Sequence, residues 1–256
     1  MLATKVKAKG LDSYVRQIAE IPEAIQRTVI FSLNDTVDDL HKRQLIEMEL
    51  SFDRVTPYVK RGLRKRYAAG RSRAGFKAPS VKGAGVYFEE FGGGMPPNDV
   101  VAPHVFGGPR KQKKNERRLG DAFWRDGEGN TYNLGSGYYA IMANGYPRNQ
   151  YNNITPARYS EMLSKLGTID TAKARPGQKR RKGNQKGYFI KTTGGYPSAV
   201  MERTGKNVKT MLVLTRKAPT YKKRYKFFEV AESQIRTSLP RHFNRILQKE
   251  IRRRFG

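Results

Sequence analysis

The stretch from Ile21 to Phe52 constrains the fold most, because apolar spacing, a helix-start signal and charge agree there. Apolar side chains recur at three- and four-residue steps with one polar interruption, at Gln44. The apolar positions are Ile25, Val29, Leu33, Val37, Leu40 and Met48. This spacing places a single apolar stripe on one face of a helix, and Pro22 stands where a first-turn proline is tolerated. The sequence predicts a long amphipathic helix that serves as a packing scaffold.

This predicted helix is also acidic. From Glu20 to Asp53 the chain has eight carboxylates against three cations, so this segment carries about −5 while the whole chain carries +29. Everything outside it therefore carries about +34. We expect the acidic side chains to meet basic loops of a neighbouring copy, and the candidates for this inter-subunit face are Asp35, Asp38, Asp39, Glu47 and Glu49. The alternative is an ordinary amphipathic helix whose acidic face is solvated.

The net charge of +29 also restricts the partners of the chain. Self-repulsion on this scale destabilises a compact monomer unless counter-charges lie nearby. Nucleic acid and acidic protein neighbours are the two expected sources of that negative charge.

Composition sets further expectations for the cellular setting. The chain has no cysteine, so neither disulfides nor thiolate chemistry are expected. The N-terminal residues lack the apolar segment of a signal peptide, and no apolar run reaches the roughly 20 residues that span a bilayer. We expect a protein that is made and used in the cytoplasm, or released from it by lysis, without membrane contact.

The pattern of elements predicts an α+β fold for residues 1–256 as a single domain. A second helix is expected from Phe228 to Ile251, with a kink or break at Pro240. We expect the long N-terminal helix and this C-terminal helix to pack on a mainly antiparallel sheet. Its strands are predicted at residues 86–91, 138–143, 188–191, 198–203 and 208–215. Basic segments without large apolar residues predict flexible loops at about 70–85 and 171–185.

Several intermediate segments have a less certain assignment. Residues 54–82 hold ten basic residues and no acidic ones, and they fit either a turn of helix after Pro57 or a strand at 63–67. Residues 101–108 are expected to be a turn-rich approach to a short basic helix at 110–119. Thr155 and Pro156 predict a helix start, with the helix over 157–166. Trp124 is interpreted as a core anchor.

Clusters of basic residues near tyrosines are the strongest functional signal in the chain. They suit contacts with phosphate or with an acidic neighbour, although for each residue alone a solvated surface charge is the competing interpretation. No helix-turn-helix, zinc-finger or RNA-binding signature accompanies them, so sequence-specific recognition is not predicted. The contact candidates are Arg61, Arg64, Lys65, Arg66, Lys111, Lys113, Lys114, Arg180, Arg181 and Lys182.

No residue pattern predicts catalysis, a metal site or a cofactor site. His41, His104 and His242 stand far apart, and no cysteine can complete a zinc site. The glycines at 92–94 lack the lysine and serine of a phosphate-binding loop. Adjacent carboxylates at 38–39 and 89–90 point in different directions on a helix or strand, and no nucleophile-elbow pattern is present. We therefore expect no enzymatic activity and no cofactor.

Several short motifs, taken together and in order, resemble a family of tailed-phage structural proteins. They are Ser51-Phe-Asp-Arg-Val-Thr-Pro57 after a long helix, Val101-Ala-Pro-His-Val-Phe-Gly-Gly-Pro-Arg110 leading into Glu116-Arg-Arg-Leu119, Asn153-Ile-Thr-Pro-Ala-Arg-Tyr-Ser-Glu-Met-Leu163, Tyr221-Lys-Lys-Arg-Tyr-Lys-Phe-Phe-Glu-Val-Ala231 and Leu239-Pro-Arg-His-Phe243. The family is the minor tail protein Z type of tail-completion or neck protein. The motifs cover most of the chain, and each is short and non-catalytic.

The resemblance implies a non-enzymatic component of the virion tail or neck, assembled in the host cytoplasm. Such a protein would form a homo-oligomeric ring at the head–tail junction and join the tail to the connector. Its implied partners are the tail terminator or tube, the head–tail connector or portal, and genomic DNA in the channel. From the residues alone, the alternative is a non-sequence-specific nucleic-acid-binding protein, such as a chromatin-like or ribosome-associated factor.

Overall fold

A computed structural model describes residues 3–5, 23–68, 84–89, 95–125, 131–166 and 187–255. The fold is α+β, as the sequence predicts, with a long helix near each end of the chain and antiparallel sheets between them. The chain forms two compact units: unit 1 is residues 1–108 with 222–256, and unit 2 is residues 109–221. The assignment of residues 1–256 to a single domain stays a prediction.

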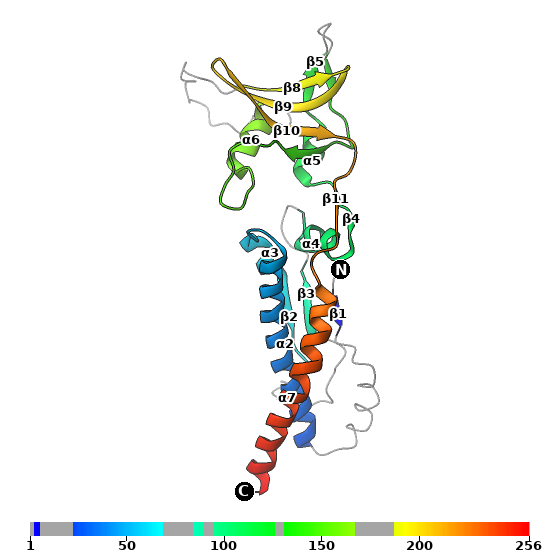
Figure 1. The fold of residues 1–256 in the computed structure, drawn as a ribbon, viewed down its shortest axis with the longest axis vertical. Helices are drawn as coiled ribbons and strands as arrows, with labels where there is room; N and C mark the ends of the chain where they lie inside the picture. Colours follow the sequence, from blue (N-terminus) through cyan, green and yellow to red (C-terminus); the bar gives the residue numbers. More distant parts are fainter. Residues whose placement is uncertain are drawn as a thin grey trace, which may run out of the picture. The chain divides into compact units, whose positions relative to one another are not determined.

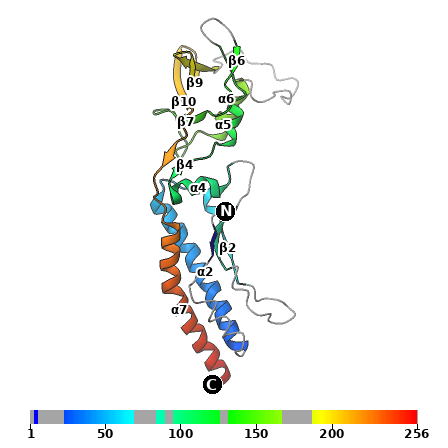
Figure 2. The same cartoon turned by 90° about the vertical axis from the view of Figure 1, so that its right-hand side faces the viewer.

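Two long helices form the body of unit 1. Helix α2 (Glu23–Ser51) and helix α7 (Phe227–Phe255) run side by side and antiparallel (Figures 1 and 2). The predicted stripe of α2 is buried from Val29 through Met48, whereas Ile25 at its start is only half-buried. The prediction of an amphipathic scaffold helix is therefore confirmed, with its N-terminal end less buried than the rest.

Gln44, the polar interruption of the stripe, is fully buried against the start of α7. Its Nε2 donates to the Phe227 carbonyl at 2.7 Å, and its Oε1 accepts from the Tyr225 hydroxyl at 2.8 Å. Tyr225 and Phe227 are themselves fully buried, so these bonds form out of water. Because buried polar groups are costly when unpaired, this pair of bonds fixes which turn of α2 faces the start of α7.

A three-stranded antiparallel sheet completes unit 1, with strand order β1-β3-β2. The strands are β1 (Ala3–Lys5), β2 (Leu63–Arg66) and β3 (Gly85–Phe88), and the shorter helices are α3 (Pro57–Gly62) and α4 (Pro97–Phe106). Both assignments left open for residues 54–82 occur in succession: Thr56 caps α3 by accepting from the Val59 N–H at 3.4 Å, and β2 follows at once. The central strand β3 buries Val86 and Phe88 against the helices.

Two expectations for unit 1 differ from the structure. The turns expected at residues 101–108 are wrong, because these residues lie mostly in α4, which begins at Pro97, contains Pro103 and buries Val101 and Val105. A break at Pro240 is wrong too, because α7 continues through it, whereas the alternative of a kink there stays a prediction. A proline removes one backbone donor from a helix, and here tertiary contacts outweigh that loss. The helices α3 and α4 are in close contact at Gly62, since a Cβ on Gly62 would overlap the Pro97 ring.

Unit 2 is built on a four-stranded antiparallel sheet with strand order β7-β10-β9-β8. Its strands are β7 (Tyr139–Met142), β8 (Gly187–Thr193), β9 (Tyr196–Thr204) and β10 (Asn207–Thr215), which confirms the predicted strands in this region. Two helices, α5 (Lys114–Leu119) and α6 (Pro156–Lys165), contribute Leu119, Met162 and Leu163 to the core on one face of the sheet.

Two small strand pairs complete the fold. In unit 2, strand β5 (Phe123–Arg125) pairs with β6 (Thr131–Asn133). At the point where the chain passes from one unit to the other, β4 (Gly108–Pro109) pairs with β11 (Thr220–Tyr221). Trp124 is half-buried at the edge of the unit 2 core and stacks on the Tyr132 ring with centroids 5.0 Å apart. This agrees with its interpretation as an anchor.

A buried ion pair holds the N-terminal side of unit 2. The Glu116 carboxylate is 2 % exposed and accepts both guanidinium arms of Arg110, the Lys113 N–H at 2.7 Å and the Ala140 N–H at 2.9 Å. Burial by itself would raise the pKa of Glu116, but these hydrogen bonds and the Arg110 charge outweigh it and lower the pKa below its usual value. The carboxylate thus ties the 110–113 segment, α5 and β7 together.

Replacing Gln44 tests the buried bonds between α2 and α7. We expect Gln44→Leu to destabilise the protein by about 1–3 kcal/mol in urea unfolding, because the buried Tyr225 hydroxyl and the Phe227 carbonyl each lose their side-chain partner. Adding Tyr225→Phe should cost little more, since the hydroxyl then keeps only its longer bond to the Gln44 carbonyl, at 3.4 Å. Simple addition of the two single effects would show that the two side chains do not act together.

Replacing Glu116 tests the buried pair in unit 2. We expect Glu116→Gln to cost about 3–5 kcal/mol, because it leaves the Arg110 charge buried without a counter-charge. Glu161→Gln is the matched control, since its partner Lys165 is half-exposed on the same helix and such pairs contribute about 0.5 kcal/mol or less. Because the folded pKa of Glu116 is lowered, its stabilisation is full above the unfolded value near 4.5 and declines as the pH falls. Equal urea midpoints for Glu116→Gln and Glu161→Gln would show that the buried pair of Arg110 and Glu116 stabilises unit 2 no more than an exposed pair does.

Candidate functional site

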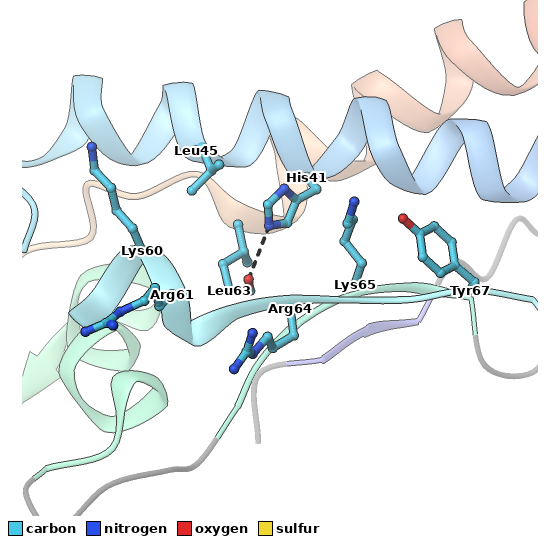
Figure 3. A pocket seen from close by; sticks show the side chains of 8 residues that line it. All are labelled: His41, Leu45, Lys60, Arg61, Leu63, Arg64, Lys65 and Tyr67. Carbon is cyan, nitrogen blue, oxygen red and sulfur yellow. Dashed lines mark hydrogen bonds between the residues drawn. The ribbon is translucent and has the colours of Figure 1, made fainter. Parts of the chain in front are cut away.

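Unit 1 contains a surface cleft of about 520 Å³ between α2 and the α3–β2 segment (Figure 3). It brings together Arg61, Arg64 and Lys65, three of the contact residues predicted from sequence. The complete lining is His41, Leu45, Lys60, Arg61, Leu63, Arg64, Lys65 and Tyr67. The cleft therefore combines four cations with a histidine, two leucines and a tyrosine.

Successive side chains of strand β2 point to opposite faces of the strand, so the basic residues are divided between the two faces. Lys65 and Tyr67 extend toward α2, whereas Arg64 points away from it (Figure 3). Arg64 donates to Glu89 at 2.7 Å, and the Arg66 guanidinium lies over the Tyr87 ring at 5.1 Å, so both contact the β3 side. The basic run is consequently divided between two faces of the strand, and Arg66 does not line the cleft.

Asp38 of α2 binds the two β2-side groups that face it. Its Oδ1 accepts from Lys65 Nζ and from the Tyr67 hydroxyl, each at 2.7 Å. Burial raises the pKa of Asp38, but these bonds and the charges of Lys65 and Lys42 outweigh burial and lower it. In turn, the bonds to Asp38 and Tyr67 raise the pKa of Lys65. The cleft wall is charged and internally paired at this point.

His41 connects α2 to strand β2 by a hydrogen bond. Its Nε2 lies 3.2 Å from the Leu63 carbonyl, so this nitrogen carries the proton and donates it. Burial lowers the pKa of His41, with the Leu63 bond acting in the opposite direction and the Lys65 charge lowering it further. An uncharged imidazole therefore sits among the cations at neutral pH.

The cations of the cleft differ in their partners. Lys60 pairs with Glu49, and Arg64 pairs with Glu89, whose side chains are 58 % and 40 % exposed. Arg61 is exposed and donates only to the Pro57 carbonyl, at 3.4 Å, with no carboxylate in reach among the residues that the structure describes. The cleft thus already binds carboxylates at several cations and leaves Arg61 open to an external one.

The acidic face predicted on α2 is engaged within the same chain. Asp35 binds Arg245, Asp39 binds Arg241 and His242 at 2.8 Å each, and Glu47 pairs with Arg43 at 3.7 Å. With Asp38 and Glu49 held at the cleft, every one of the five predicted carboxylates has a basic partner inside unit 1. Their proposed contact with a neighbouring copy stays a prediction.

The remaining predicted contact residues do not join the cleft. Lys111, Lys113 and Lys114 are exposed near the start of α5 in unit 2, where Lys113 lines a separate hollow of about 230 Å³ with Glu116 and Tyr159. The predicted residues Arg180, Arg181 and Lys182, and most of the predicted loops at 70–85 and 171–185, lie outside the described residues.

Sequence reasoning missed five of the cleft residues. Lys60, Leu63 and Tyr67 belong to the same basic, tyrosine-containing run and could have been added from it. His41 and Leu45 come from α2, four residues apart on one face, and only the packing of β2 beside that face reveals them.

Neither a metal centre nor a membrane span emerges from the described parts of the chain. Among the described side chains, no group of three or more histidine, aspartate or glutamate residues is placed to hold a metal ion. None of the described helices is long and apolar enough to cross a membrane.

Comparison with protein-family models, with curated proteins and with solved structures gives no match to this chain. The functional argument therefore uses the geometry and the charges of the molecule itself.

Two aspartates on α2 provide a test of the acidic face. Asp39, whose side chain is 25 % exposed, binds Arg241 and the largely buried His242, whereas Asp38 is 40 % exposed. We expect Asp39→Asn to reduce the free energy of unfolding by about 1–2 kcal/mol and Asp38→Asn by about 0.5 kcal/mol or less. Thermal or urea unfolding measures both. Unchanged stability in both variants would mean that these carboxylates do not help to hold the fold.

Proposed function

We propose that this chain is a structural subunit of a tailed-phage head–tail junction, which assembles as a ring and joins the tail to the connector. The observation that carries the proposal is that at least twelve of the 22 carboxylates pair with cations of the same chain, while the chain as a whole keeps a net charge of +29. Intrachain ion pairs involve Asp35, Asp38, Asp39, Glu47, Glu49, Asp53, Glu89, Glu116, Glu161, Glu202, Glu229 and Glu232.

This internal pairing leaves a surplus that only other molecules can balance. Each pair consumes one cation, so the net charge of +29 remains over the rest of the surface. Like-charged copies repel one another, and a ring of them is stable only beside negative partners. Genomic DNA in a channel and acidic faces of the tail terminator, tube, connector or portal would supply that charge.

The sequence motifs give the proposal its biological setting. The resemblance to the minor tail protein Z type covers residues in both units, from Ser51–Pro57 through Asn153–Leu163 to Leu239–Phe243. Two of these motifs lie at structurally important places, since Tyr221–Ala231 contains the buried Tyr225 and Phe227, and Glu116 is the buried carboxylate of unit 2. These positions support a shared structural role for the motifs.

Quantitative mass spectrometry of purified phage particles tests the proposal. We expect a small, fixed number of copies per particle, located at the neck in a low-resolution map. Absence of the chain from particles, together with salt-dependent DNA binding by the purified monomer, would support the rival function of a free nucleic-acid-binding protein. That result would overturn the head–tail assignment.

A further inference from the structure

We propose that the cleft between α2 and β2 is a docking site for an acidic segment of a neighbouring protein, one that carries both carboxylates and an apolar side chain. This inference rests on the proposed function only for where the partner would be found, namely at the head–tail junction. The charges and apolar residues of the cleft are the same whatever the function of the chain. It names a ligand class for residues that the sequence predicted merely as contacts for DNA or an acidic neighbour.

The rim of the cleft is built to bind carboxylates. Arg64 and Lys65 each hold a carboxylate oxygen at 2.7 Å, and Lys60 binds a third carboxylate. Arg61 stands at the same rim without one among the described residues. An incoming carboxylate can therefore bind Arg61 directly. A second one can exchange with Glu89 at Arg64, because the Glu89 side chain is 40 % exposed.

The interior of the cleft is apolar rather than basic. Leu45 is half-buried there, Leu63 lies behind it, and His41 is kept uncharged by burial. A leucine-sized side chain on the incoming segment would gain about tenfold or more in affinity from such a surface, since burying one contributes about 1.5–3 kcal/mol. The phosphates of a nucleic acid would contact only the basic rim and would leave the apolar interior unfilled.

The aromatic residue of the cleft is fixed in its wall. The Tyr67 hydroxyl is bonded to Asp38, and Lys65 Nζ lies 5.4 Å from the ring centroid. Tyr67 is 45 % exposed, so its ring adds accessible apolar surface at the edge of the cleft. The combination of a basic rim with an apolar interior and edge matches an acidic, partly apolar peptide.

Fluorescence anisotropy with three labelled probes tests the ligand class on the purified full chain. The probes are a peptide of repeated Glu-Leu-Glu-Gly units, the same peptide with serine in place of leucine, and an oligothymidylate of equal charge. We expect the leucine peptide to bind about tenfold more tightly than the serine peptide, because only leucine fills the apolar interior. Equal affinities for the two peptides would overturn the proposed apolar contact.

Two arginine variants locate the binding. We expect Arg61→Gln to weaken binding of the leucine peptide about tenfold, because a hydrogen-bonded charge pair is lost. The matched control is Arg236→Gln, whose side chain is 80 % exposed on α7 and pairs with Glu232, and it should change the affinity less than twofold. Similar losses in both variants would show general charge attraction and overturn the site. Circular dichroism melting confirms that each variant is folded.

The oligothymidylate and the particle experiment separate the remaining outcomes. If Arg61→Gln weakens oligothymidylate binding and leaves the leucine peptide unaffected, the cleft binds phosphate and the peptide proposal is wrong. If the peptide binds in the cleft but the chain is absent from phage particles, the docking site stands and the head–tail assignment fails. If the chain is present in phage particles but the leucine peptide does not bind in the cleft, the head–tail assignment stands and the docking site fails.

Discussion

The imbalance of charge governs how this chain holds itself together. A chain of 256 residues with a net charge of +29 repels itself, and several of its 22 carboxylates lie where they join different segments. They lie along α2 opposite α7, at the cleft beside β2, and in the core of unit 2 at Glu116. Each position joins segments that are distant in sequence. These carboxylates are thereby paired within the chain, and the excess of lysine and arginine side chains remains on its surface.

Polar groups in the core give this basic chain its specific arrangement. Apolar contact alone would let α2 and α7 slide past each other, because a stripe of leucine and valine is similar from turn to turn. The bonds from Gln44 to Tyr225 and Phe227 select one register, and the Asp39 pairs with Arg241 and His242 hold the next turns of α7 beyond Pro240. The same logic applies in unit 2, where the Glu116 carboxylate is satisfied from three directions.

The candidate site follows from the same use of charge. Strand β2 divides a continuous basic run, so that Lys65 pairs with α2 while Arg64 and Arg66 contact the β3 side, and the gap between strand and helix becomes a cleft with a basic rim. A surface that already holds carboxylates on three of its cations is suited to exchange them with a partner. A carboxylate displaced in such an exchange returns to water at little cost, because the Glu89 and Glu49 side chains are already 40 % and 58 % exposed.

Elements whose signal is local could be predicted from the sequence. The stripe of α2, the strands of the main sheet and the helix after Thr155 follow from apolar spacing and helix-start signals that neighbouring residues set. The sequence also identified Arg61, Arg64 and Lys65 as members of a basic run. Three further features became visible with the folded chain: α4 forms despite Pro103, α7 continues through Pro240, and His41 and Leu45 face that run. They depend on contacts between segments far apart in the chain, and such contacts leave no periodic trace in the sequence.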